Sequence, residues 1–156
     1  MLYGIPYYQN SIGHKYTTML GAKVTATGRM VPDVSFNSAV YGGVMTYETT
    51  PDYPTGHWFL NGGTSAASPA WAAIVALIGQ AIGRHPGFIN SEIYGFVGQN
   101  SQGTGPFHDI KQGNNAICSG ECGEDGFVAG KGYDLTTGFG TPNVSQLISA
   151  FVQDHQ

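Results

Sequence analysis

Charged side chains are scarce in this chain. Its 156 residues include six Lys and Arg, ten Asp and Glu and five His, and charged residues make up 10% of the composition, against about 25% in ordinary soluble proteins. The few cations and the formal net charge of −4 argue against nucleic acid as a partner. Few ionisable groups also limit the self-repulsion that unfolds proteins in acid, so this composition is compatible with work at low pH.

Long apolar runs are also missing. The longest one, residues 70–78, has nine residues, far fewer than the ~20 that a membrane helix needs. We therefore expect no membrane partner. Residues 1–10 contain no basic segment followed by an apolar one, so no signal peptide is visible there.

Cysteine is limited to Cys118 and Cys122, which lie in a glycine-rich segment. A local disulfide, a bound metal and two free thiols all remain open. The disulfide is favoured, because no histidine or further cysteine lies close by to complete a zinc site.

Apolar residues are plentiful, at 41% of the chain, and the 24 glycines indicate many turns. Alternation and β-branched residues predict strands at Met30–Phe36, Val40–Thr46 and His57–Leu60. Apolar residues at helical spacing predict a helix over Ala70–Ile82 that is buried on nearly all sides, with Pro69 at an early helical position. Further helices are predicted at Asn90–Val97 and Val144–Val152. Strands followed by a buried helix predict an α/β layered fold.

A serine stands where a glycine turn meets the start of the expected core helix. Ser65 lies within the segment Gly62–Pro69, which reads GGTSAASP. The first N–H groups of a helix have no intrahelical partner, and the helix dipole favours negative charge at this end. A serine hydroxyl beside such donors is suited to nucleophilic acyl transfer. The alternative is that Thr64, Ser65 and Ser68 only cap the helix, as Ser and Thr often do.

A base for Ser65 is hard to find in the chain. The only histidine between the first aspartate, Asp33, and Ser65 is His57, which lies on the strand that leads into the same turn. His155, with Asp109 or Asp134 as its acid, has the chain order of an α/β-hydrolase triad. It is the penultimate residue, where fraying is expected. A His-dependent hydrolase therefore stays open as the weakest hypothesis.

Two pairs of carboxylates have the spacing of neighbours on one helix face. Glu48 and Asp52 enclose Pro51, so a solvated turn is expected there instead of a helix. Glu121 and Asp125 flank Cys122 in a glycine-rich loop. We interpret neither pair as catalytic.

Four segments together resemble the serine-carboxyl peptidases, the family of sedolisin, kumamolisin and the lysosomal tripeptidyl peptidase. They are Arg29–Val34, Gly62–Pro69, Phe107–Asn115 and Gly130–Pro142. The Gly-Thr-Ser segment is shared with subtilisins, whereas the two downstream segments are not subtilisin features. The resemblance runs in the family's order from about residue 25 to the C-terminus.

The resemblance implies a subtilisin-like fold, a mostly parallel sheet flanked by helices, of which residues 1–156 form the C-terminal part. Ser65 matches the position of the nucleophile. In the family a glutamate, assisted by an aspartate, is the base, and a second aspartate lies in the oxyanion hole. All three belong to segments upstream of those found here. Asp33 matches a separate Pro-Asp-Val segment, so it is not assigned the oxyanion role. A carboxylate base suits chemistry in acid, where a histidine is already protonated.

The resemblance also implies a calcium site. Five residues match the family's calcium ligands: Asp109, Ile110, Gly130, Gly132 and Asp134. Calcium takes six to eight oxygen ligands from carboxylates, backbone carbonyls and water, and this set offers two carboxylates and three carbonyls. The alternative is that Asp109 caps a turn and residues 130–134 are only a glycine loop. With the resemblance, we favour Ca2+.

The leading hypothesis is thus the C-terminal part of an acid-acting serine peptidase, inactive alone because Ser65 lacks its base. Its substrate is a peptide or protein, and a separate chain that bears the upstream half is an expected partner. The second hypothesis is a non-catalytic, calcium-stabilised binding domain of the same fold. Secretion or residence in a lysosome-like acidic compartment is implied by the resemblance alone.

Overall fold

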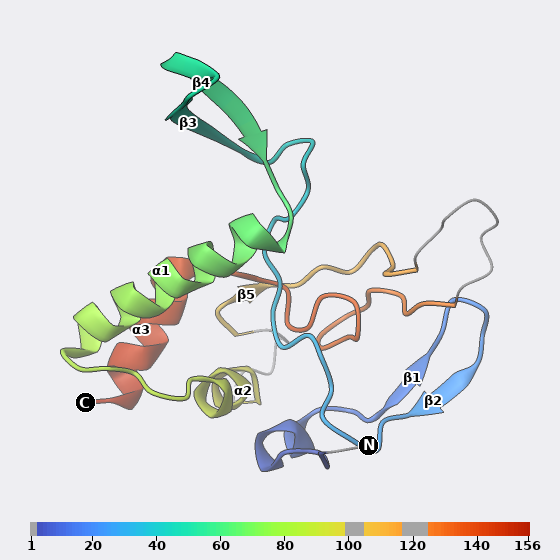
Figure 1. Ribbon diagram of the computed structural model, residues 1–156. Coiled ribbons are helices and arrows are strands. Elements are labelled where there is room, and N and C mark those ends of the chain that lie inside the picture. The colour runs from blue at the N-terminus through green and yellow to red at the C-terminus, as the bar shows by residue number, and fades with distance from the viewer. Residues whose placement is uncertain (1–2, 99–104, 117–124) are drawn as a thin grey trace.

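The computed structural model describes residues 3–98, 105–116 and 125–156. Cys118, Cys122 and Glu121 lie outside these ranges. Along the chain the elements are η1 (Tyr7–Ser11), β1 (Lys15–Thr17), β2 (Lys23–Thr25), β3 (Val44–Thr50), β4 (Tyr53–Asn61), α1 (Thr64–Ile82), α2 (Asn90–Gly98), β5 (Phe107–His108), β6 (Thr141–Pro142) and α3 (Val144–Asp154) (Figure 1).

Helix α1 begins six residues before the predicted start. Gly63 is its N-cap, with φ of 80°, and Gly83 ends it with φ of 70°. Both are left-handed conformations that glycine adopts readily. Pro69 is consequently the sixth helical residue, not an early one. Its missing N–H removes the bond that the carbonyl of Ser65 would otherwise accept.

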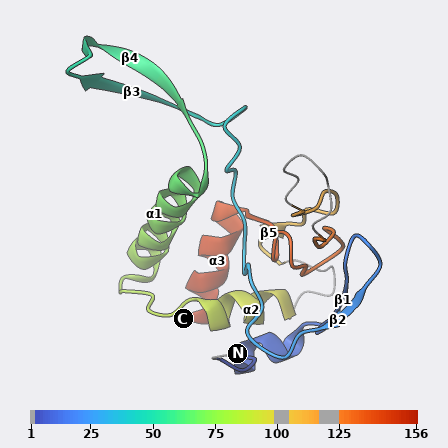
Figure 2. The ribbon, with the colours of Figure 1, turned by 45° about the vertical axis from the view of Figure 1, so that its right-hand side comes forward.

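The core lies where the three helices meet the C-terminal loops. Helix α1 packs on α3, and α2 packs on η1 (Figure 2). The cluster of buried apolar residues comprises Ile74, Ile78, Ile93, Tyr94, Val97, Phe107, Phe139, Leu147 and Phe151. The prediction that α1 is buried on nearly all sides is wrong for this chain, because only Ile74 and Ile78 of the helix are buried. Of the helices described, α1 alone is long and apolar enough to span a membrane.

The strands of the described residues form three antiparallel pairs, β1–β2, β3–β4 and β5–β6. No parallel sheet is present in this part of the chain. The predicted strands at Val40–Thr46 and His57–Leu60 are found as the hairpin β3–β4, with shifted ends. The predicted strand at Met30–Phe36 is wrong: this segment carries no strand.

The hairpin β3–β4 projects from the body of the molecule (Figures 1 and 2). Two glycines allow the backbones to meet at its base. A Cβ at Gly43 would lie 2.2 Å from the carbonyl oxygen of Asn61, and a Cβ at Gly62 would lie 2.8 Å from that of Ala39. The hairpin therefore leads directly into Gly63 and the first turn of α1.

Candidate functional site

Ser65 is the second residue of α1 and is exposed. The N–H groups of Ala66 and Ala67 both donate to the carbonyl of Gly63, at 3.0 and 3.4 Å. Among the described residues, no hydrogen bond is made by the N–H or the Oγ of Ser65. The residue thus presents a hydroxyl and a free backbone donor together at the positive end of a helix dipole.

The capping alternative does not fit this geometry. The N-cap of α1 is Gly63, and no side chain makes a capping hydrogen bond. The hydroxyls of Thr64, Ser65 and Ser68 are therefore not used to satisfy the first turn.

Ser65 lines a cavity of about 340 Å³ between the hairpin and α1. Hairpin residues Val44, Thr46 and Asn61 form one wall, and the remaining lining residues are Gly62, Ala66 and Pro69. The Asn61 amide donates to the Thr46 hydroxyl, which fixes both side chains on that wall. The cavity is mostly apolar.

The two candidate histidine bases lie elsewhere. His57 pairs with Glu48 across the hairpin, and its ring stacks on that of Tyr53 with centroids 4.7 Å apart. His155 accepts a hydrogen bond at Nδ1 from Arg84, which follows the C-terminal end of α1. Ser65 is at the opposite end of this helix, about 26 Å away at 1.5 Å per residue. His155 is therefore not the base of Ser65, and this hypothesis is wrong.

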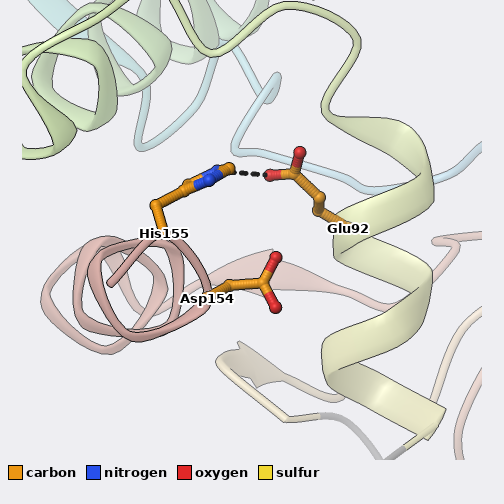
Figure 3. A group of neighbouring side chains, drawn as sticks. All are labelled: Glu92, Asp154 and His155. Atoms are coloured by element: carbon orange, nitrogen blue, oxygen red, sulfur yellow. Dashed lines mark ion pairs between the residues drawn. The ribbon is translucent and has the colours of Figure 1, made fainter.

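His155 instead belongs to a charged cluster that joins α2 to the end of α3 (Figure 3). Its Nε2 lies 3.4 Å from Oε2 of Glu92, and Asp154 completes the group within 4.8 Å. A metal-bound imidazole donates its second N–H to an acceptor. Here Nδ1 faces Arg84, which can only donate, so Nδ1 is the acceptor and Nε2 carries a proton. The cluster therefore joins α2 to the C-terminal end of α3 and does not present Nε2 as a metal ligand.

The other carboxylate pairs are also not catalytic partners of Ser65. The expected turn is found only at Asp52, because Glu48 lies in strand β3 and pairs with His57. Asp125 accepts a hydrogen bond from the N–H of Leu20 at 3.0 Å. A hydrogen bond from Thr18 is the main cause that lowers its pKa. This contact holds the loop that contains Asp125 against the N-terminal hairpin β1–β2.

Asp33 is the centre of a polar network that sequence reasoning missed. Its Oδ2 accepts from Arg29 at 2.5 Å and from Asn90 at 2.9 Å, and its Oδ1 accepts from the Tyr94 hydroxyl at 2.8 Å. Gln9, which is fully buried, donates to the Tyr94 hydroxyl at 2.8 Å. Burial raises the pKa of Tyr94 above its ordinary value. Both oxygens of Asp33 are occupied, so its role is to join residues 29–33 to α2.

The residues matched to the calcium ligands lie on two loops that the structure brings together. Asp134 is buried; its Oδ2 accepts from the N–H of Gly130 at 2.8 Å, and its Oδ1 accepts from the N–H of Thr137 at 2.7 Å. Asp109 accepts at Oδ2 from the N–H of Gly132 at 3.1 Å. Residues 109–110 and 130–134 therefore form one local assembly.

One carboxylate oxygen in this assembly has no partner. Oδ1 of Asp109 is buried and makes no hydrogen bond with the described residues, while Lys111 lies 3.9 Å from the other oxygen, Oδ2. A buried, unpaired anionic oxygen is costly unless a donor or a cation meets it. The unpaired oxygen of Asp109 is a hard donor of the kind that Ca2+ prefers, whereas both oxygens of Asp134 already accept hydrogen bonds from the chain. The residue set therefore offers a calcium ion one open carboxylate oxygen, that of Asp109.

Comparisons with known proteins give relatives but no matching family model. Tripeptidyl-peptidase SED1 of Arthroderma otae is 31% identical over 152 residues, which are 94% of this chain and 20% of that protein. Kumamolisin of Bacillus sp. is 36% identical over 126 residues, 81% of this chain and 20% of the relative. Human tripeptidyl-peptidase 1 is 35% identical over 132 residues, 81% of this chain and 21% of the relative.

The fold is also similar to that of a solved structure. Pseudomonas sedolisin, a serine-carboxyl proteinase complexed with pseudo-iodotyrostatin, superposes with a TM-score of 0.75 at 26% identity, covering 100% of this chain and 36% of that chain. The predicted α/β fold class, present as a portion of a larger fold, is thereby confirmed. The chain spans about a fifth of the length of the curated relatives it matches.

Proposed function

The chain is related to the serine-carboxyl peptidases in sequence and in fold, and from this premise we propose that it is the C-terminal, nucleophile-bearing part of a serine peptidase domain. The observation that carries the proposal is the free Oγ and free N–H of Ser65 at the start of α1. Its substrate class is peptides or proteins.

In the proposed reaction the Ser65 hydroxyl attacks a peptide carbonyl. A base takes its proton, the Oγ–C bond forms, and the carbonyl oxygen becomes an oxyanion. The N–H of Ser65 donates to that oxyanion. Collapse breaks the C–N bond and releases the amine with a proton, and water then releases the acyl group from Ser65.

No carboxylate or imidazole of the described residues forms a hydrogen bond with Ser65. We propose that the base is a glutamate, and the second oxyanion donor an aspartate, both supplied by the remaining part of the domain. A carboxylate can still accept the Ser65 proton in acid, where a histidine is already protonated. We therefore propose that the reaction takes place under acidic conditions, in a secreted or lysosome-like setting. This chain alone is then inactive.

We further propose that Asp109, Ile110, Gly130, Gly132 and Asp134 hold Ca2+. The ion would neutralise the unpaired Oδ1 of Asp109 and join the two loops, with the carbonyls of Ile110, Gly130 and Gly132 as further ligands. Its contribution is to stability, since a ligand bound only by the folded state stabilises that state.

The test is active-site labelling with a fluorophosphonate or a peptide aldehyde. The chain is labelled alone and when co-expressed with the upstream part of the Pseudomonas sedolisin domain. Modification of Ser65 is expected only in the assembled form and at acidic pH. Ser65→Ala abolishes it, whereas Ser68→Ala, which removes another exposed serine of the same helix turn, leaves it intact.

The second candidate function is a calcium-stabilised, non-catalytic binding domain. The observation that favours it is that all five residues proposed to hold Ca2+ lie within the described part of the chain, whereas no base for Ser65 is found there. An assembled form that binds Ca2+ but leaves Ser65 unmodified would replace the peptidase proposal with this one.

A further inference from the structure

The ends of three helices meet at one imidazole, that of His155. Arg84 follows the C-terminal end of α1 and donates to Nδ1 of this ring at 2.5 Å, and Glu92 of α2 lies 3.4 Å from its Nε2. Asp154, the last residue of α3, completes the group, in which one ring nitrogen and one oxygen of each carboxylate lie within 4.8 Å of one another (Figure 3). The imidazole thus has a cation at one nitrogen and a carboxylate at the other.

The two nitrogens of this ring are not equally satisfied. Nδ1 accepts from Arg84 and carries no proton, because a guanidinium can only donate. Nε2 of His155 and Oε2 of Glu92 are both buried, and neither makes a hydrogen bond with the described residues. Their separation of 3.4 Å is longer than an ordinary N–H···O bond of roughly 2.7–3.2 Å. The contact with Arg84 is therefore formed, whereas the contact with Glu92 is incomplete.

A second proton on the ring reverses this preference. An imidazole ordinarily takes up that proton between about pH 8 and pH 5. Here the proton must bind Nδ1, because Nε2 already carries one. Nδ1 then becomes a donor that faces the donors of Arg84, and two positive charges meet. The hydrogen bond between Arg84 and His155 is consequently lost in acid, and the guanidinium moves into solvent, to which Arg84 is already exposed.

The same proton strengthens the contact with Glu92. A hydrogen bond between a cationic donor and a carboxylate is shorter and roughly twice as strong as a neutral one. The Nε2 of His155 and Oε2 of Glu92 already face each other (Figure 3), so a small movement closes the gap between them. Carboxylic acids ordinarily lose their protons below about pH 5, so an ionised acceptor is available while the imidazole titrates.

The loop that bears Arg84 does not depend on the guanidinium for its position. The N–H of Arg84 donates to the carbonyl of Gly79 at 3.1 Å, and the N–H of Gly83 donates to that of Gln80 at 3.4 Å. These backbone bonds end α1 whether or not the side chain of Arg84 contacts His155. Loss of that contact therefore frees the end of α3 from this loop and leaves the end of α1 intact.

From this geometry we propose that Arg84, Glu92, Asp154 and His155 form an acid-operated switch at the end of α3. Near neutral pH, His155 joins α3 to the loop that follows α1. In acid it releases Arg84 and binds Glu92, which joins α3 to α2 instead. The switch lies at the end of α1 opposite Ser65 and does not rest on the function proposed above. It gives the chain a structural response to acid that is independent of catalysis.

Double-mutant cycles on the full chain test this exchange of partners. Arg84→Met removes the donors of the guanidinium, and Glu92→Gln removes the charge of the carboxylate. His155→Phe removes both ring nitrogens and keeps a ring to stack on Phe151. The coupling of Arg84 with His155 should change the unfolding equilibrium constant about fivefold near pH 8 and not near pH 5. The coupling of Glu92 with His155 should instead rise in acid, to about fivefold near pH 5.

Two further measurements make the result specific. The cycle of Arg84→Met with His57→Phe is the control, because His57 is an imidazole of the hairpin strand β4, and it should show no coupling at either pH. Nitrogen NMR of the unchanged chain reads the protons directly and does not require any variant to fold. The ring of His155 should carry its single proton on Nε2 near pH 8 and protons on both nitrogens near pH 5.

Three results would overturn the switch. The first is a coupling of Arg84 with His155 that is the same at both pH values. The second is a His155 ring whose proton lies on Nδ1 near pH 8. The third is a coupling of Glu92 with His155 that does not rise in acid, since α3 would then gain no new partner. None of these results changes the labelling of Ser65, so this proposal and the peptidase proposal fail separately.

Discussion

The loops around Asp33 and Asp134 and the region formed by α1 and the hairpin β3–β4 differ in where their side chains find partners. Asp33 and Asp134 each accept three or more hydrogen bonds from within the chain, and the glycines beside them fit against backbone. The hairpin and the outer face of α1 instead leave large apolar side chains in solvent. The first region is stabilised by the chain itself, and the second has the surface of an interface.

The largest effect is expected from Gly138→Ala in the first region. A Cβ at Gly138 would lie 2.2 Å from the carbonyl oxygen of Asp33, and its φ is 62°. The left-handed conformation and the clash together should cost about 3 kcal/mol or more of unfolding free energy. Gly21→Ala is the control, because Gly21 has φ of 87° but nothing within 4 Å, and it should cost only about 1 kcal/mol. Urea denaturation measures both, and equal costs would contradict the close approach.

Removal of calcium should have the next largest effect. At a calcium concentration of about 100 times Kd, the bound ion stabilises the fold by about 2.7 kcal/mol, so excess chelator lowers Tm. Asp109→Asn keeps the side-chain shape but removes the charge, and its Tm should no longer respond to chelator. Asp154→Asn changes an exposed carboxylate in the charged cluster and should leave the response intact. Since protons compete for the ligand carboxylates, the chelator effect shrinks in acid. An unchanged melting curve in excess chelator would remove the site.

Tyr94→Phe tests the network of Asp33 without changing the shape of the core. The variant removes the hydroxyl that donates to Asp33 and accepts from Gln9, which leaves the buried amide of Gln9 and the half-buried carboxylate of Asp33 without this partner. The expected loss is about 1–3 kcal/mol of unfolding free energy. Tyr41→Phe, at a residue that is 93% exposed, should change stability by less than about 0.5 kcal/mol. Thermal unfolding that fails to separate the two variants would contradict a structural role of the network.

Two other tyrosines, Tyr16 and Tyr133, should make stability fall at alkaline pH. Burial raises the pKa of Tyr16 to about 12 and raises that of Tyr133 as well. The folded state therefore keeps phenol protons that the unfolded chain, with a tyrosine pKa of about 10, releases. Stability is unaffected below pH ~10 and falls between about 10 and 12, by up to about 1.4 kcal/mol per pH unit for each such group. Urea unfolding across this range measures the slope, and Tyr16→Phe should make it shallower.

The sequence predicts the helices and strands that are determined by residues close together in the chain. Helical periodicity identifies α2 and α3 almost to their ends, since the predicted Asn90–Val97 and Val144–Val152 differ from the observed helices only at the C-terminus. The start of α1 is missed because the backbone angle of Gly63 sets it, with no Ser or Thr cap to indicate it. The predicted strand at Met30–Phe36 fails because its backbone groups bond to loops: Ser35 donates to Gly140, and Phe139 donates to Asp33.

The candidate site also includes residues that the sequence identifies and residues that it does not. The segment around Ser65 is recognisable because the residues that present it are contiguous. The Asp33 network is not, because its partners Asn90 and Tyr94 lie 57 and 61 residues further along the chain. The exposure of α1 is also not predictable, since an apolar pattern indicates a buried helix whether or not the covering layer belongs to the same chain.

The smallest loss of stability is expected at the outer face of α1. It tests most directly whether the region of α1 and the hairpin differs from the self-stabilised loops around Asp33 and Asp134. Leu77→Ala should change the stability of this chain by less than about 0.5 kcal/mol, because the side chain is 47% exposed. Ile78→Val, one residue further along, should cost about 0.5–1.5 kcal/mol although it removes less, because Ile78 is fully buried against the core. Denaturation of the isolated chain compares the two. If Leu77→Ala proved the costlier, the outer face of α1 would already be covered within this chain, and α1 would belong with the self-stabilised region.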